Sequence, residues 1–206
     1  MNIETWFLFF GTSFIATIVP GPSVILGLNH GSKYGYRKSI ATALGMTTVA
    51  AIMGFVSLLG LGAVLKTSGT VFQIIKLFGA TYLIYLGIKT WIAKIDPIEN
   101  KQNNSIQKSP LSLYSQAILV GLSNPKAIIF FTAFFPQFLD PNSPQISQFA
   151  VIIITLSFVV FLCMMIYIIG GRSITSILRK SKIRQLLNRL TGGVFVGFGI
   201  GVALSK

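Results

Sequence analysis

The segment TIVPGPSVILGLNHG, residues 17–31, places two prolines around a glycine inside an apolar block long enough to cross a membrane. Proline has no amide hydrogen, and its ring clashes with the carbonyl one turn earlier, so it interrupts a helix. Pro20 and Pro22 would therefore free the carbonyl groups of Ala16 and Ile18. An unsatisfied backbone group in hydrocarbon costs several kcal/mol, so a helix interrupted at this depth needs a compensating partner.

The composition and the distribution of charge indicate a membrane protein with several spans. Of the 206 residues, 52% are hydrophobic and only 10% are charged, and the mean hydropathy is +0.75. Soluble domains carry about 25% charged residues. The net charge of +13 comes mainly from lysines and arginines in the short segments between apolar blocks. That pattern is typical of membrane topology and argues against nucleic-acid binding.

Six apolar blocks approach or exceed the length of about 20 residues that a spanning helix needs. The sequence therefore predicts an all-α integral membrane protein with six transmembrane helices. Because the last block is short and rich in glycine, five helices are the alternative. The predicted spans cover roughly residues 4–28, 40–65, 70–92, 113–139, 148–170 and 188–205.

The basic residues alternate between the connections, which predicts how the chain is oriented. The second connection has a single lysine and the fourth has no basic residue, whereas the odd connections are basic. By the positive-inside rule the odd connections are cytoplasmic and both termini face outward, which also favours an even number of helices. The basic residues of the odd connections are Lys33, Arg37 and Lys38, then Lys94, Lys101 and Lys108, and finally Arg172, Arg179, Lys180, Lys182, Arg184 and Arg189.

Two of these connections have recognisable patterns. Residues 94–112 are polar and bounded by prolines, which predicts a flexible loop between two halves, about 1–93 and 113–206, of a single transmembrane domain. In the fifth connection, apolar residues recur at helical spacing between cations. They predict either an amphipathic helix on the cytoplasmic membrane surface or a cytoplasmic extension of the sixth helix.

The two halves resemble each other at corresponding positions. PGPSVILGL in the first predicted helix matches SNPKAIIFF in the fourth, and Pro125 follows Pro22 by 103 residues. KLFG from Lys76 likewise matches RLTG from Arg189. Because each half holds three helices, the second half enters the membrane from the opposite side, which makes an inverted repeat. The two interrupted helices then face each other and form a binding site, the alternative being that the prolines serve helix packing only.

Two longer segments carry a resemblance to a known family. PGPSVILGLNHGSKYGYRKSIATALGM and GLSNPKAIIFFTAFFPQFLDP resemble the two signature regions of the LysE/RhtB family of amino-acid exporters, and the resemblance runs nearly end to end. It implies a bacterial inner-membrane protein that exports amino acids or close derivatives and is driven by the proton gradient. With the repeat, it favours a secondary transporter working by alternating access. A passive channel, or an efflux carrier for another small metabolite, is the alternative.

Polar residues beside the two helix breaks are the candidates for binding substrate. Lys126 lies deep in the fourth predicted helix and could hold the carboxylate of an amino acid or act as a positive gate. Ser23 and Asn124 could contact substrate or satisfy freed backbone groups. His30 is expected to be solvated at a loop edge. The candidate binding and helix-break residues are Pro20, Gly21, Pro22, Ser23, Asn124, Pro125 and Lys126, and the secondary or gate candidates are Asn29, Gln137 and Thr47.

Scarce residue types narrow the function further. The four carboxylates lie outside the depths of the predicted helices, and the chain has one histidine and one cysteine, Cys163. These side chains supply neither a metal site nor acid–base machinery, so we expect no enzyme, metal or cofactor. Many proton-driven transporters move protons through a carboxylate inside the membrane, and the predicted helices have none at depth, so the route of proton coupling stays open. The same scarcity of carboxylates favours neutral substrates resembling threonine or homoserine over cationic ones.

Glycines at helical spacing predict close contacts between helices. Gly193, Gly197 and Gly201 form one such series, and Gly27, Gly31 and Gly35 form another. Glycine lets two backbones approach closely. These series therefore indicate packing inside the bundle, with a homodimer as the alternative. The other expected partners are the amino-acid substrate, the lipid bilayer and the proton.

Overall fold

The architecture was obtained from a computed structural model of the whole chain. It describes residues 1–65, 69–93, 108–124, 127, 131, 138–139, 144–178 and 181–204.

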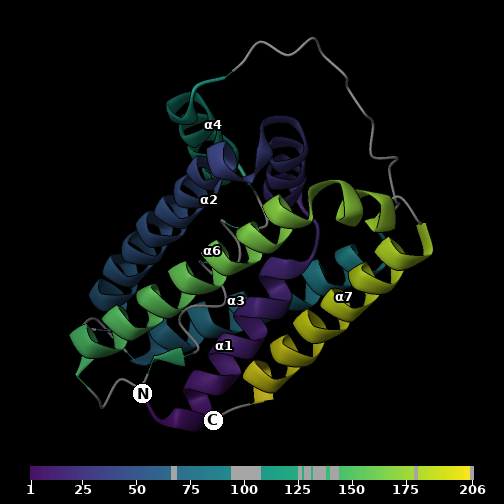
Figure 1. Cartoon of the computed structure of the whole chain (residues 1–206). Helices are drawn as coiled ribbons and strands as arrows, with labels where there is room; N and C mark the ends of the chain where they lie inside the picture. Colours follow the sequence, from purple (N-terminus) through teal and green to yellow (C-terminus); the bar gives the residue numbers. More distant parts are fainter. Residues whose placement is uncertain are drawn as a thin grey trace.

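The described residues form a bundle of α-helices without strands, as predicted (Figure 1). Two stretches, Pro22–Ser57 and Ile146–Gly171, are long and apolar enough to cross a membrane, and two further apolar helices are shorter. The helices are α1 (Ile3–Ile18), α2 (Pro22–Leu65), α3 (Gly69–Trp91), α4 (Pro110–Leu122), α6 (Gln145–Leu178) and α7 (Ser181–Leu204).

The first predicted helix is interrupted where the prolines stand. The helix α1 ends at Ile18, Val19 is extended with φ −70° and ψ 129°, and α2 begins at Pro22. Proline is well suited to the first turn of a helix because its missing amide would have no partner there. At the second predicted break, α4 ends at Leu122 and Asn124 is no longer helical. The structure thus confirms the first break and the end of the helix that leads into the second.

The expected loop between the first two spans is a sharp bend within α2. Gly35 has φ 75° and ψ 164°, while residues 22–34 and 36–65 on either side are helical. A positive φ of this kind is readily available to glycine alone. Glycine also bends α6, at Gly171, where φ is 25°. The helices therefore extend beyond the approximate span boundaries at residues 28 and 40, and the connection between them is the bend at Gly35.

The fifth connection divides between two helices. Residues 172–178 continue α6 beyond its bend, and α7 runs without a break from Ser181 to Leu204. Of the two alternatives, the extension of the sixth helix is the one found for residues 181–190. Leu186 and Leu190 on this extension are exposed.

The close contact between α3 and α7 does not use all of the glycines that the sequence predicted to pack inside the bundle. A Cβ atom at Gly197 or Gly201 would meet nothing within 4 Å. One at Gly192 would lie 2.5 Å from the carbonyl oxygen of Gly87, in the contact between α3 and α7. The interpretation of the Gly193 series as bundle packing was therefore wrong at positions 197 and 201. A homodimer through that face stays a prediction.

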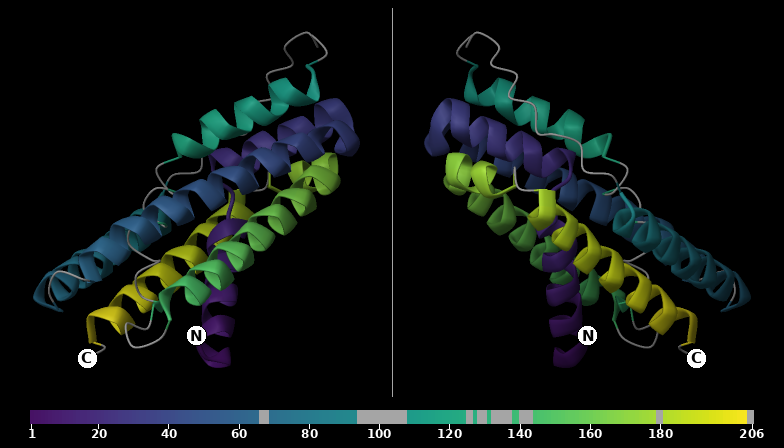
Figure 2. Two further views of the ribbon diagram at one scale, coloured as in Figure 1. Left: turned by 90° about the vertical axis from the view of Figure 1, so that its left-hand side faces the viewer. Right: turned by 90° about the vertical axis from the view of Figure 1, so that its right-hand side faces the viewer.

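Helix α2 is central to the bundle, packing against both α6 and α4, while α3 packs against α7. Both termini lie at the same end of the molecule (Figures 1 and 2). This arrangement brings together the end of α1, the start of α2 and the end of α4. They lie between helix α6 and residues 36–65 of α2, which are called the second arm of α2 below.

Candidate functional site

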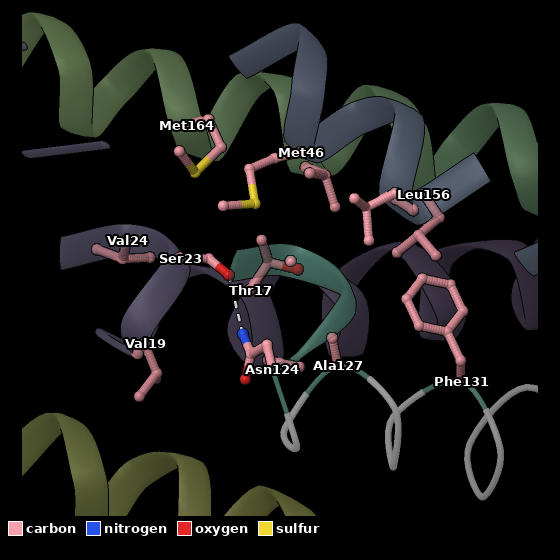
Figure 3. A pocket seen from close by; sticks show the side chains of 16 residues that line it. Thr17, Val19, Ser23, Val24, Met46, Asn124, Ala127, Phe131, Leu156 and Met164 are labelled. Carbon is pink, nitrogen blue, oxygen red and sulfur yellow. Dashed lines mark hydrogen bonds between the residues drawn. The ribbon is translucent and has the colours of Figure 1, made fainter. Parts of the chain in front are cut away.

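A cavity of about 100 Å³ lies where the two helix breaks meet. Of its described lining side chains, three are polar, namely Thr17, Ser23 and Asn124 (Figure 3). Among the described lining residues none carries a charged side chain. Ligand sites are typically apolar cavities with a few polar groups that orient the ligand. The apolar lining consists of Ala16, Val19, Val24, Met46, Val49, Ala50, Ala127, Phe131, Leu156, Val160 and Met164, together with Gly21 and Gly121.

One hydrogen bond joins the two breaks directly. The side-chain amide of Asn124 donates to the hydroxyl of Ser23 over 2.8 Å, although the residues are 101 positions apart. Ser23 occupies the first turn of α2, and Asn124 directly follows Ser123, the C-cap residue of α4. Asn124 is only 6% exposed. Two residues chosen from the sequence because they stand beside prolines are therefore in contact at the wall of the cavity.

Local contacts satisfy the backbone of Asn124. Its amide donates to the carbonyl of Gly121 over 3.2 Å, and its carbonyl accepts from the amide of Ala127 over 3.0 Å. Buried backbone groups are nearly always paired in this way. The side-chain amide of Asn124 is oriented toward Ser23 (Figure 3).

The carbonyl of Ile18, which the prolines were predicted to free, has a partner on another helix. The hydroxyl of Tyr167 on α6 donates to it. Tyr167 is 5% exposed and packs against Val24 and Leu28 of α2. At this carbonyl the break is compensated by a side chain rather than by ligand. No pattern in the sequence points to Tyr167, which stands in an apolar run.

Removing the Tyr167 hydroxyl is expected to destabilise the protein. Tyr167→Phe keeps the ring but deletes the donor to the buried Ile18 carbonyl, and an unsatisfied buried acceptor costs about 1–3 kcal/mol. The melting temperature of the detergent-solubilised protein should fall. Tyr85→Phe, an exposed tyrosine on α3, serves as the control and should melt like the wild type. Equal melting temperatures for all three proteins would show that another group satisfies the carbonyl.

The remaining candidate residues are dispersed. Asn29 is exposed on α2, outside the cavity lining. The hydroxyl of Thr47 donates to the carbonyl of Ala43 over 2.9 Å, within its own helix, and this residue does not line the cavity either. The structure therefore does not bring these two gate candidates to the site. The positions of Pro125, Lys126 and Gln137 lie outside the described residues.

His30 departs from the expectation of a solvated side chain. It is 5% exposed, its Nδ1 atom lies 2.7 Å from the hydroxyl of Thr42, and its ring packs edge-on against Tyr34. The bend at Gly35 folds the second arm of α2 back against the first, and this contact covers His30. The expectation was wrong because it assumed a loop at this position.

The site contains no metal-binding cluster within the part of the chain that is described: no group of three histidine, cysteine, aspartate or glutamate side chains is close enough there to hold an ion. Among the residues that the structure describes, the polar side chains lining the cavity carry amide and hydroxyl groups. Such groups bind polar ligands by hydrogen bonding.

Helices α1 and α4 end at a shared cavity, in a bundle whose described part has two stretches long and apolar enough to cross a membrane. The chain is a member of the LysE type translocator family, whose family model matches residues 14–206. It is 33% identical to a homoserine/homoserine lactone efflux protein of Salmonella typhimurium over all of this chain and 99% of the relative, and equally to the protein of that name from Salmonella typhi. It is also 31% identical to an uncharacterized membrane protein of Vibrio cholerae over the full length of both chains. No solved structure matches the chain.

Proposed function

We propose that this protein is a secondary transporter that exports amino acids or their close derivatives across the bacterial inner membrane. The observation that carries the proposal is the hydrogen bond between Ser23 and Asn124, which joins the two helix breaks at the cavity. Discontinuous helices that meet in the middle of a bundle are typical of substrate sites in secondary transporters. The two Salmonella relatives, named as efflux proteins for homoserine and its lactone, support the choice of substrate class.

The contact between α3 and α7 supports an inverted repeat within one domain. A Cβ atom at Gly87 would lie 2.7 Å from the carbonyl oxygen of Gly192, and one at Gly199 would lie 2.8 Å from that of Ala80. These contacts pair residues in opposite order along the two helices, so α3 and α7 run antiparallel, as the third and sixth helices of an inverted repeat must.

The directions of the helices support six alternating spans. Gly27 and Gly31 on α2 meet Met164 and Ile168 in the same order along α6, so these two helices run parallel. The contacts between α3 and α7 run in opposite order, so that pair is antiparallel. Six alternating spans require a parallel first and fifth helix and an antiparallel third and sixth. With both termini at one end (Figure 2) and the basic connections inside, we place both termini outside the cell.

The chemistry of the cavity supports a zwitterionic ligand with a neutral side chain. The first turn of α2 lines the cavity at Ser23, and the N-terminal end of a helix attracts a carboxylate. The C-terminal end of α1 lines it at Thr17, and that end of a helix attracts an ammonium group. We assign Lys126 a role in holding the carboxylate, and threonine or homoserine is the size of substrate favoured. Export is driven by the proton gradient through alternating access.

Transport by purified protein in lipid vesicles tests this function. Vesicles loaded with unlabelled amino acid should take up the labelled compound faster than empty vesicles, because a carrier exchanges bound substrate across the membrane. A panel of neutral, cationic and anionic amino acids, with homoserine lactone, identifies the class transported. Uptake that does not saturate and is not accelerated by internal substrate would instead indicate a passive channel. Uptake of none of these compounds by well-incorporated protein would refute amino-acid export and bring other metabolites forward.

A further inference from the structure

We propose that Leu156 and Phe131 set the length of side chain that the cavity accepts, so that short neutral amino acids are exported and longer ones are excluded. The inference rests on the proposed function and deepens it by assigning specificity to two side chains. Neither residue carries a polar group, and neither was a candidate from the sequence.

The cavity has a polar region and an apolar end. Ser23 and Asn124 form the polar region, at the helix breaks where the charged groups of an amino acid would bind. Figure 3 shows Leu156 and Phe131 close to each other and away from that pair. A ligand held by its charged groups at the breaks would therefore direct its side chain toward these two residues.

The spacing of the lining residues along α6 indicates how far Leu156 lies from the polar pair Ser23 and Asn124. Met164, Val160 and Leu156 line the cavity at intervals of one helical turn, about 6 Å each. Gly27 contacts Met164, and α2 runs parallel to α6, so Ser23, one turn before Gly27, is level with Val160. Leu156 is then roughly one turn, about 6 Å, beyond the polar pair. That space suits a short side chain.

The apolar end is backed by packed core and cannot easily widen. Leu156 is 2% exposed and Phe131 is 6% exposed, and both belong to one core cluster with Phe9, Phe138 and Ile152. The rings of Phe9 and Phe138 pack edge-on with centroids 5.0 Å apart. Close-packed interiors transmit strain instead of yielding to an added group. A longer substrate side chain would have to displace this cluster.

The cavity wall beside the methionines can adapt to a ligand more easily than the apolar end can. Met46 and Met164 form part of the wall above the polar pair (Figure 3). Methionine is flexible and adapts to ligands of different shape. The backbone at Phe131 is held as well, since its carbonyl accepts a hydrogen bond from the hydroxyl of Ser57 over 2.7 Å. Discrimination by length is therefore expected at Leu156 and Phe131 rather than at the methionines.

A competition experiment with Leu156→Ala tests the inference. Vesicles containing the purified protein are given labelled threonine and labelled leucine together, and the ratio of the two exchange rates is measured. The wild type should prefer threonine. Leu156→Ala removes three carbons from the apolar end, and one methylene in a pocket is worth about 10-fold or more in discrimination. The leucine-to-threonine ratio should therefore rise at least about tenfold.

Leu113→Ala is the matched control. Leu113 is fully buried on α4 but does not line the cavity, so its truncation weakens packing and should keep the wild-type ratio. An unchanged ratio in Leu156→Ala, or a wild type that exchanges leucine as fast as threonine, would overturn the inference while leaving amino-acid export intact. Exchange of neither compound by the wild type would instead refute the proposed function. If Leu156→Ala does not fold, Leu156→Val must shift the ratio in the same direction, and failure to do so overturns the inference as well.

Discussion

Replacing Asn124 with leucine is expected to reduce substrate exchange by at least about tenfold, which corresponds to about 1.4 kcal/mol. Leucine has the same number and branching of side-chain heavy atoms as asparagine but cannot donate to Ser23, and it removes the amide from the polar part of the cavity. Leaving the Ser23 hydroxyl without this partner at a buried wall adds to the loss. The measurement is the initial rate of exchange in vesicles, normalised to the amount of incorporated protein.

A double-mutant cycle with Ser23→Ala shows whether the two breaks act together. Contacting residues typically couple by about 0.5–3 kcal/mol, so the double variant should be less impaired than two independent losses imply. Asn188→Leu on α7 is the matched control, because Asn188 is not among the described residues around the cavity. Normal exchange by Asn124→Leu would mean that the contact between the breaks serves neither binding nor transport.

Gly31→Ala should have the largest effect on folding. A Cβ atom at this position would lie 2.2 Å from the carbonyl oxygen of Ile168 and 2.8 Å from its Cα atom. These are backbone atoms, so no change of side-chain rotamer relieves the clash, and α2 and α6 would have to separate. Overpacking of this kind costs about 1–3 kcal/mol and at times more. We expect a large fall in the yield of folded protein and in its melting temperature in detergent.

Gly197→Ala provides the contrast for this prediction. Gly197 also lies within a helix, but an added Cβ would meet nothing within 4 Å. Alanine has the higher helix propensity, so this variant should be as stable as the wild type or slightly more stable. If Gly31→Ala and Gly197→Ala melt alike, the close approach of α2 to α6 does not exist in the native protein.

The helix breaks could be predicted from the sequence because their cause is local. Pro20 and Pro22 interrupt a helix through their own rings and missing amides, whatever surrounds them. The same reasoning identified Ser23 and Asn124, which prove to be in contact. The gate candidates Asn29 and Thr47 lie outside the cavity lining, and the sequence does not determine which side of a helix faces the cavity.

The bend at Gly35 shows why one local expectation failed. A loop and a bend both suit a segment rich in glycine and basic residues, and the sequence does not separate them. The tertiary contacts do, since the two arms of α2 pack together and bury His30 against Thr42. His30, which was expected to be solvated because of its place in the sequence, is thus covered by residues of the second arm of α2.

The sequence by itself determined the helical class, the interruption at the prolines and the membership of a membrane translocator family, because these depend on composition, local geometry and similarity. Only the tertiary structure decided which surfaces meet: Tyr167 with the carbonyl of Ile18, and Leu156 at the apolar end of the cavity. The physical reason is that such contacts depend on the rotation and axial position of each helix against its neighbours. Those two quantities are fixed by packing many side chains at once, and no short segment encodes them.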